Sequence, residues 1–168
     1  MPRVGLALGS NLGNRLANLR AAWELLLLLG RPGGKLLQAP VYQTAPVQCP
    51  PDSPDFYNTV VEIDYEGTPS ELLEQTQRIE LKLGREATAP RNAPRVVDVD
   101  LLYFGELTLA SSGLVLPHPR LTRRRFVLQP LADIRPDLKL PGDPLSIAEH
   151  LRRLTSDEPP LTRVRTAW

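Results

Sequence analysis

Residues 96–104, Val-Val-Asp-Val-Asp-Leu-Leu-Tyr-Phe, restrict the possible folds of this chain more than any other segment. Apart from the two aspartates, every residue in it is apolar or aromatic, which is typical of a strand buried in a sheet. A carboxylate without a partner in such a strand costs several kcal/mol of desolvation. Asp98 and Asp100 therefore require positive charge beside them, either from side chains or from bound cations.

The two aspartates are expected on one side of this strand, because side chains two residues apart share a face and lie ~6–7 Å apart. Val97, Val99 and Leu101 then face a core on the other side. Two carboxylates at this spacing can bind one or two hard cations, and oxygen ligands favour Mg²⁺ or Mn²⁺ over zinc. The alternative, which an isolated Asp-x-Asp pattern favours, is that both aspartates pair with arginines on an exposed face.

Basic residues flank the aspartate segment on both sides. They are Arg85, Arg91 and Arg95 before it and His118, Arg120, Arg123, Arg124 and Arg125 after it. A site for a nucleotide polyphosphate typically combines carboxylates, which bind metal ions, with guanidinium groups, which bind phosphates. Taken alone, the arginine cluster is as typical of a solvated surface or a nucleic-acid patch. Gln77 and Glu80, which share one face of a predicted helix, are by themselves typical of solvated polar residues.

Composition limits the class of protein. Twenty basic and nineteen acidic residues give a net charge of +1, so an anion site must be local and a nucleic-acid partner is not expected. The single cysteine, Cys49, cannot form an internal disulfide and favours a reducing, cytoplasmic location. The apolar N-terminal stretch is too short for a signal peptide, and the leucine run at 25–29 is too short for a membrane span.

Periodicity predicts a single α+β domain over residues 1–168, with a C-terminal tail at about 156–168. Strands are predicted at 3–9, 35–44, 56–66 and 96–104, and a short hairpin at 105–116. Helices are predicted at 15–30, 68–84 and 144–154.

Asn11 or Asn14 is expected to cap the first helix, and Thr68 and Glu71 form a capping box on the second. Pro40 predicts an edge or bent strand. Short connections favour a mainly antiparallel sheet with helices packed on it.

Seven motifs follow one another along nearly the whole chain, at residues 7–14, 41–47, 55–63, 76–85, 91–105, 116–121 and 124–134. The most specific is Arg-Asn-Ala-Pro-Arg-Val-Val-Asp-Val-Asp at 91–100, followed by Pro-His-Pro at 117–119. In these motifs the chain resembles the 6-hydroxymethyl-7,8-dihydropterin pyrophosphokinase family of folate biosynthesis. The resemblance implies a ferredoxin-like domain that transfers the pyrophosphoryl group of ATP to the hydroxymethyl oxygen of the pterin and releases AMP.

The resemblance also implies a role for each site residue. Asp98 and Asp100 would hold two Mg²⁺ ions, and Arg85 and Arg95 would stabilise charge on the transferred group. The residues implied to contact ATP are Gln77, Glu80, Arg91, Leu101, Val115, His118 and Arg124. The residues implied to contact the pterin are Thr44, Ala45, Val47, Phe56, Asn58 and Phe126, with the ring stacked between the two phenylalanines. The protein is expected to be a monomer with no nucleic-acid or membrane partner.

Phe56 and Asn58 lie two residues apart on one predicted strand, and an aromatic face beside an amide suits a flat heteroaromatic ligand. A plain core role for Phe56 is the alternative. The chain departs from the family pattern at Asn92, at Gln48–Cys49 and at Thr122–Arg123, which concerns loop closure more than chemistry. The competing function is a ferredoxin-like nucleotide- or RNA-binding module without catalysis. Such a module needs exposed strand aromatics with basic flanks, and an aspartate pair on the strand fits it poorly.

Overall fold

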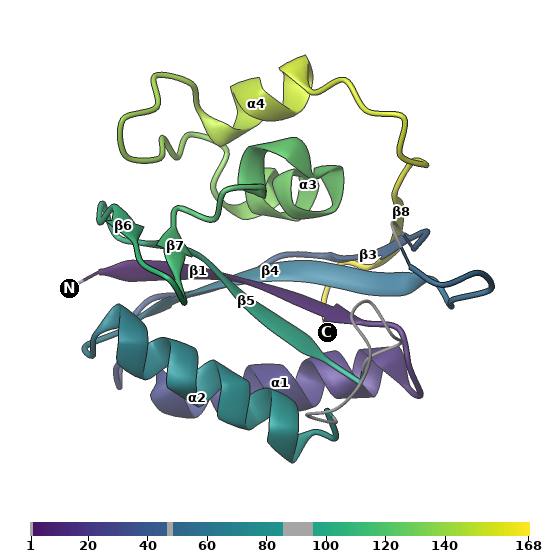
Figure 1. The fold of residues 1–168 in the computed structure, drawn as a ribbon, viewed down its shortest axis with the longest axis horizontal. Helices are drawn as coiled ribbons and strands as arrows, with labels where there is room; N and C mark the ends of the chain where they lie inside the picture. Colours follow the sequence, from purple (N-terminus) through teal and green to yellow (C-terminus); the bar gives the residue numbers. More distant parts are fainter. Residues whose placement is uncertain (1, 47–48, 86–95) are drawn as a thin grey trace.

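A six-stranded antiparallel sheet forms the centre of the described part of the molecule, with helices on both faces (Figure 1). The computed structural model describes residues 2–46, 49–85 and 96–168. The strand order is β5-β1-β4-β3-β8, and β2 also pairs with β4. The strands are β1 (Arg3–Ser10), β2 (Leu36–Gln38), β3 (Val41–Thr44), β4 (Phe56–Asp64), β5 (Asp98–Phe104) and β8 (Thr162–Arg165). The predicted α+β fold with an antiparallel sheet is confirmed.

Helices cover both faces of the sheet (Figure 1). One face packs against α1 (Arg15–Leu29) and α2 (Pro69–Lys82), and the other packs against α3 (Arg125–Ile134), over which α4 (Ile147–Arg153) lies. The predicted hairpin is present as β6 (Leu109–Ala110) and β7 (Val115–Leu116), and a 3-10 turn covers Leu121–Arg123. None of the helices in the described ranges combines the length and apolarity that a membrane crossing requires.

Local side-chain chemistry sets the helix starts. Asn14 caps α1 by accepting from the Ala17 amide at 3.1 Å. The predicted capping box of Thr68 and Glu71 is present at the start of α2. The predicted start of the last helix at residue 144 is wrong: α4 begins at Ile147, because Ser146 forms its own capping box with the following turn.

Two segments differ from the sequence interpretation. The predicted strand at 35–44 divides at Ala39–Pro40 into β2 and β3, and β3 is not an edge strand because it pairs with both β4 and β8. Residues 156–168, expected only as a tail, contain β8. No helix was predicted at α3, which includes Pro130.

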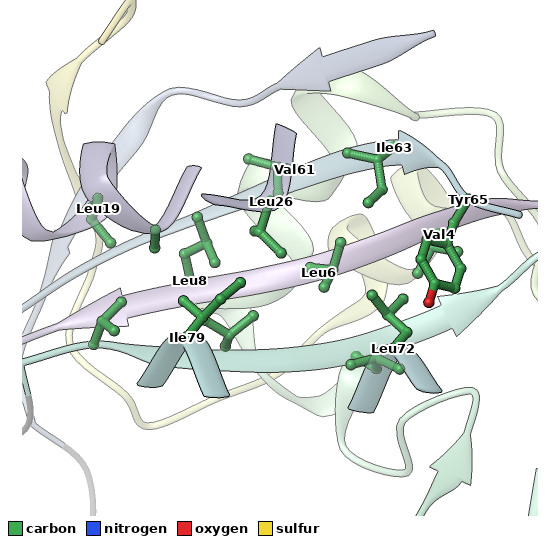
Figure 2. Packing of buried hydrophobic residues seen from close by; sticks show 14 of the residues in the cluster. Val4, Leu6, Leu8, Leu19, Leu26, Val61, Ile63, Tyr65, Leu72 and Ile79 are labelled. Atoms are coloured by element: carbon green, nitrogen blue, oxygen red, sulfur yellow. The ribbon is translucent and has the colours of Figure 1, made fainter. Parts of the chain in front are cut away.

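The core between the sheet and the first two helices is closely packed (Figure 2). The helices contribute Leu19, Ala22 and Leu26 of α1 and Leu72 and Ile79 of α2. As predicted, Val97, Val99 and Leu101 belong to this core. A second cluster lies under α3 and α4 and is formed by Val60, Leu102, Tyr103, Leu121, Val127, Leu128, Leu131, Leu140 and Ile147. Residues on β5 that face α3 can therefore lie beside an apolar wall.

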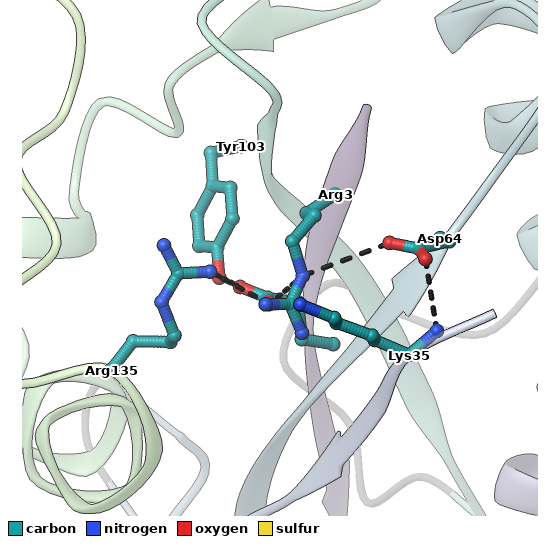
Figure 3. A network of polar contacts seen from close by, with 6 residues as sticks. Arg3, Lys35, Asp64, Tyr103 and Arg135 are labelled. Carbon is teal, nitrogen blue, oxygen red and sulfur yellow. Dashed lines mark hydrogen bonds and ion pairs between the residues drawn. The ribbon is translucent and has the colours of Figure 1, made fainter. Parts of the chain in front are cut away.

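A buried ion-pair network stabilises the N-terminal end of β1 (Figure 3). The fully buried Glu62 carboxylate lies 2.7 Å from Arg3 Nε and 2.6 Å from Arg135 Nη1, and it accepts a hydrogen bond from the Tyr103 hydroxyl. Burial and then the Glu62 charge raise the pKa of Tyr103. The Tyr103 ring covers Gly5, where an added Cβ would lie 2.3 Å from the ring.

Candidate active site

A cavity of about 760 Å³ opens at the C-terminal end of β1, on the side of the sheet that faces α3. It is lined from β1, β3, β4, β5, α3 and the loops between them. The predicted site residues that it brings together are Thr44, Ala45, Phe56, Asn58, Asp98, Asp100, His118, Arg124 and Phe126. The sequence motifs that contain them are far apart in the chain, so the antiparallel sheet is what assembles this site.

The aspartate pair forms one wall of the cavity. In the register of the sheet, Asp98 lies opposite Gly9 and Asp100 opposite Ala7 on β1. Both aspartates line the cavity, whereas Val99 between them is buried in the other core. The predicted common face is therefore confirmed. Arg85 Nη1 lies 2.9 Å from Asp98 Oδ1, so an arginine does pair with this strand, at the cavity wall.

Glu80 of α2 supports the aspartate wall from behind. Its carboxylate accepts from Arg85 Nη1 at 2.5 Å and from the Val99 amide at 3.3 Å, and the residue is buried. Burial raises the pKa of Glu80 to about 7; Arg85 and the Val99 amide oppose this effect, and Asp98 and Asp100 add to it. Burial lowers the pKa of Arg85, but the charges of Glu80, Asp98 and Asp100 outweigh this effect and raise it, so the guanidinium faces three carboxylates.

The donor set fits Mg²⁺ with incomplete protein ligation. Asp98 and Asp100 offer oxygen ligands, and no group of three or more His, Cys, Asp or Glu residues that could hold a metal exists within the described ranges. Mg²⁺ is commonly held by one or two carboxylates together with substrate phosphates and water. The two aspartates could thus hold a metal that arrives with a polyphosphate.

His118 and arginines form a basic wall of the cavity. The His118 amide donates to the Leu102 carbonyl at 2.7 Å, and its Nδ1 accepts from the Arg120 amide at 3.1 Å. Because Nδ1 is an acceptor, the ring proton belongs on Nε2. Burial, followed by the charges of Arg124 and Arg120, lowers the pKa of His118. A neutral imidazole that donates from Nε2 can bind a phosphate oxygen.

Phe56, Asn58 and Phe126 form the apolar end of the cavity. Asn58 Nδ2 donates to Thr44 Oγ1 at 2.8 Å, which fixes the amide plane. Phe56 is only partly buried and lines the cavity, so the core role considered as its alternative is not supported. Gly9 allows this arrangement, because an added Cβ would lie 2.8 Å from Asn58 Oδ1 and 3.6 Å from the Phe56 ring.

Several expected residues lie away from the cavity. Gln77 is exposed on α2, Val115 is exposed on β7, and Leu101 is buried in the core on the α2 side; none of the three lines the cavity. The predictions for Val47, Gln48, Arg91, Asn92 and Arg95, including closure of the arginine-rich loop, concern residues outside the described ranges.

Other residues also shape the site. Arg120 and Arg123, which belong to the basic cluster noted in the sequence, line the cavity, and so do Cys49 and Glu158. Asn11, considered there as a helix cap, instead donates from Nδ2 to the Pro54 carbonyl at 3.3 Å. Arg15 donates to the Asp55 carbonyl at 2.9 Å, and its guanidinium lies 4.0 Å from the centre of the Tyr57 ring. These contacts hold the start of β4, which positions Phe56; short-range sequence patterns give no signal for them.

The fold and the cavity define a class of protein: an α+β domain that can bind a nucleotide polyphosphate beside a flat second ligand. The family model described as 7,8-dihydro-6-hydroxymethylpterin-pyrophosphokinase (HPPK) matches residues 5–136. The chain belongs to this family, as its motifs suggested.

Similar proteins extend the match. The chain is 41% identical over 140 residues to 2-amino-4-hydroxy-6-hydroxymethyldihydropteridine pyrophosphokinase of Pseudomonas aeruginosa, covering 83% of this chain and 84% of that one. It is 40% identical over 158 residues to the protein of the same name from Methylorubrum extorquens, covering 92% and 94%. It is 36% identical over 156 residues to the folic acid synthesis protein fol1 of Pneumocystis carinii, covering 92% of this chain and 20% of that one.

Other relatives are longer proteins. The chain spans 26% and 23% of the length of two bifunctional folate synthesis proteins of Arabidopsis thaliana. Among solved structures, a wild-type Plasmodium falciparum HPPK-DHPS crystal structure superposes with a TM-score of 0.70 at 14% identity, covering 90% of this chain and 44% of that one. At that identity the superposition shows a common fold.

Proposed function

We propose that this domain transfers the pyrophosphoryl group of ATP to the hydroxymethyl group of 6-hydroxymethyl-7,8-dihydropterin and releases AMP, as a step of folate biosynthesis. The observation with the most weight is the single cavity in which the aspartate pair and the basic wall adjoin the Phe56–Asn58–Phe126 end. The names of the relatives from Pseudomonas aeruginosa and Methylorubrum extorquens support the same reaction.

We also propose that the domain has a ferredoxin-like fold. The element order β1-α1-β3-β4-α2-β5, with strands arranged β5-β1-β4-β3, supports this class. A non-catalytic RNA-binding module is not favoured, because the family match is to a pyrophosphokinase and the candidate strand presents aspartates. A single domain over 1–168, a monomer and a cytoplasmic location stay predictions.

At the polyphosphate end, Asp98 and Asp100 would hold Mg²⁺; two ions are the number that the family resemblance implies. When bound, Mg²⁺ neutralises charge on the phosphates. Arg85 is oriented by Glu80 and Asp98 and can donate to the moving group, and His118 can donate from Nε2 to a phosphate oxygen. Arg124 adds a further positive charge to this wall.

At the other end, Phe56 and Phe126 would stack on the two faces of the pterin, and Asn58 and Thr44 would bind its polar edge. With the pterin bound in this way, its hydroxymethyl oxygen would attack the β-phosphorus of ATP. A bond forms between these two atoms, the bond from the β-phosphorus to the bridging oxygen breaks, and AMP leaves with that oxygen. The hydroxyl proton passes to solvent. The residues contribute position and charge stabilisation, which dominate phosphoryl transfer.

The experiment is a product analysis with ATP, Mg²⁺ and the dihydropterin. We expect AMP to form only when all three are present, with one pterin diphosphate for each AMP. Formation of ADP in place of AMP, or AMP formation that does not depend on the pterin, would contradict the proposal.

A further inference from the structure

A C-terminal strap, residues 155–168, runs from α4 across the α3 side of the molecule to the edge of the sheet (Figure 1). Pairing of β8 with β3 attaches it, with Thr162 opposite Gln43. At its end, Trp168 donates from Nε1 to the Ala39 carbonyl at 2.7 Å and accepts from Gln38 Nε2 at 3.0 Å. The strap lies beyond residues 5–136, the part of the chain that the family model matches.

Glu158 is the strap residue that lines the large cavity. It also lines a second cavity of about 400 Å³, together with Tyr42 of β3 and Arg125 and Gln129 of α3. Glu158 therefore lies where the strap passes between β3 and α3, and it borders both spaces.

Among the described residues, none pairs with the carboxylate of Glu158. The residue is partly buried, and its amide donates to Ser156 Oγ at 3.1 Å. Across residues 2–46, 49–85 and 96–168, its side chain makes no hydrogen bond or ion pair. A partly desolvated acceptor without a partner costs free energy. A ligand in the cavity that donates N–H groups would recover that cost.

The distance of Glu158 from the aspartates indicates which of the two proposed ligands it contacts. In the strand order β5-β1-β4-β3, the β3 side is three strands from Asp98 and Asp100, or ~14 Å at the usual strand spacing. Thr44 and Ala45, which follow from β3, line the same cavity as Glu158. The carboxylate therefore lies toward the pterin end, away from the aspartate wall.

We propose that Glu158 is a specificity-determining residue for the pterin, accepting hydrogen bonds from its 2-amino group and the adjacent ring N–H. This inference rests on the proposed function. An amino group beside a ring N–H presents two donors in parallel, and a carboxylate can accept both at once. The amide of Asn58, already bonded to Thr44, offers only part of this recognition. The strap thus adds an acidic contact to a site otherwise built from the family-matched residues.

The test measures binding separately from turnover. The dihydropterin is titrated calorimetrically into wild type, Glu158→Ala and Glu158→Gln in the presence of Mg²⁺ and a non-hydrolysable ATP analogue, and the analogue is titrated alone. We expect Glu158→Ala to weaken pterin binding about tenfold or more, with the nucleotide dissociation constant within twofold of wild type. Glu158→Gln should be intermediate. Asp157→Ala, which removes an exposed neighbouring carboxylate outside both cavities, is the matched control and should change neither constant.

A pterin analogue that lacks the 2-amino group tests the contact itself. The loss caused by Glu158→Ala should shrink to within twofold for this analogue. An unchanged loss with the analogue, pterin affinity within twofold of wild type in Glu158→Ala, or equal weakening of nucleotide and pterin would each overturn the inference. If the binding results hold but wild type forms no AMP, the proposed function fails instead, so the two failures are distinguishable.

Discussion

Asp98 and Asp100 share one face of β5 but differ in their surroundings. Asp98 is paired with Arg85, whereas Asp100 is exposed toward the cavity. Buried Glu80 pairs with the same arginine from behind the strand. Both the metal hypothesis and the pH dependence of stability follow from this group of four side chains.

Asp98→Asn and Asp100→Asn should each lower kcat at least 100-fold, or about 2.7 kcal/mol, by removing a metal ligand. In the metal-free protein, Asp100→Asn should leave the free energy of unfolding unchanged or raise it, because it relieves like-charge repulsion. Asp98→Asn also loses the Arg85 pair, which offsets that gain. Turnover and denaturant unfolding are the measurements, with exposed Asp137→Asn as the control. Near-normal Mg²⁺-dependent turnover in either variant would exclude the metal assignment.

Glu80 makes stability depend on pH. Its pKa is about 7 in the folded protein against 4.5 for an ordinary glutamate, so the folded state binds the proton more tightly. Stability from this group is complete below pH 4.5 and is lost as the pH rises toward 7. Glu80→Gln does not titrate, so without metal it should gain about 3 kcal/mol relative to wild type between pH 4.5 and pH 8.

Urea unfolding at several pH values, with a chelator present, measures this difference. Glu74→Gln, an exposed position on the same helix, is the control and should stay within about 0.5 kcal/mol of wild type at every pH. A Glu80→Gln difference that does not change with pH would contradict the assignment.

At the scale of elements, the antiparallel pairing of β1 with β4 determines the shape of the cavity around Phe56 and Asn58. Gly9 of β1 lies opposite Asn58 of β4, and the absence of a side chain at Gly9 leaves space for Asn58 and Phe56. Two contacts thus explain the Gly-Ser-Asn sequence at residues 9–11. Gly9 leaves space for the side chains of β4, and Asn11 holds the loop that precedes β4.

Gly9→Ala should weaken pterin binding and cost about 1–3 kcal/mol of stability, because the new methyl group displaces Asn58. Calorimetry and thermal unfolding measure the two effects. Gly113→Ala in the β6–β7 hairpin, where an added Cβ meets nothing within 4 Å, is the control. Unaltered pterin affinity in Gly9→Ala would show that the Asn58 position is not required.

Phe56→Ala should weaken pterin binding by about 1–3 kcal/mol through loss of one stacking face. Nucleotide affinity should change far less, because Phe56 lies on β4, two strands away from the aspartates of β5. Calorimetric titration with each ligand measures both values. Equal weakening of ATP and pterin would mean that Phe56 supports the fold and not the ligand.

At the scale of the whole molecule, the sequence predicted the parts of the fold that depend on local pattern. The alternation in residues 96–104 predicted that both aspartates lie on one face of the strand, and Thr68 with Glu71 predicted where α2 begins. The pairing of β8 with β3 is a contact between distant segments, and no local pattern encodes it. Glu158 was missed for that reason, and Asn11 because its partner lies 43 residues away.

The central claim is that the protein transfers the β- and γ-phosphates of ATP together, as one pyrophosphoryl group, to a pterin bound in the same cavity. The most direct measurement uses ATP labelled with ³²P at the β-position, incubated with the dihydropterin, Mg²⁺ and either wild type or Asp100→Asn. The account predicts that the β-label appears in the pterin product with wild type, that unlabelled AMP is released in equal amount, and that Asp100→Asn forms almost none. Recovery of the β-label in ADP, with a singly phosphorylated pterin, would contradict it.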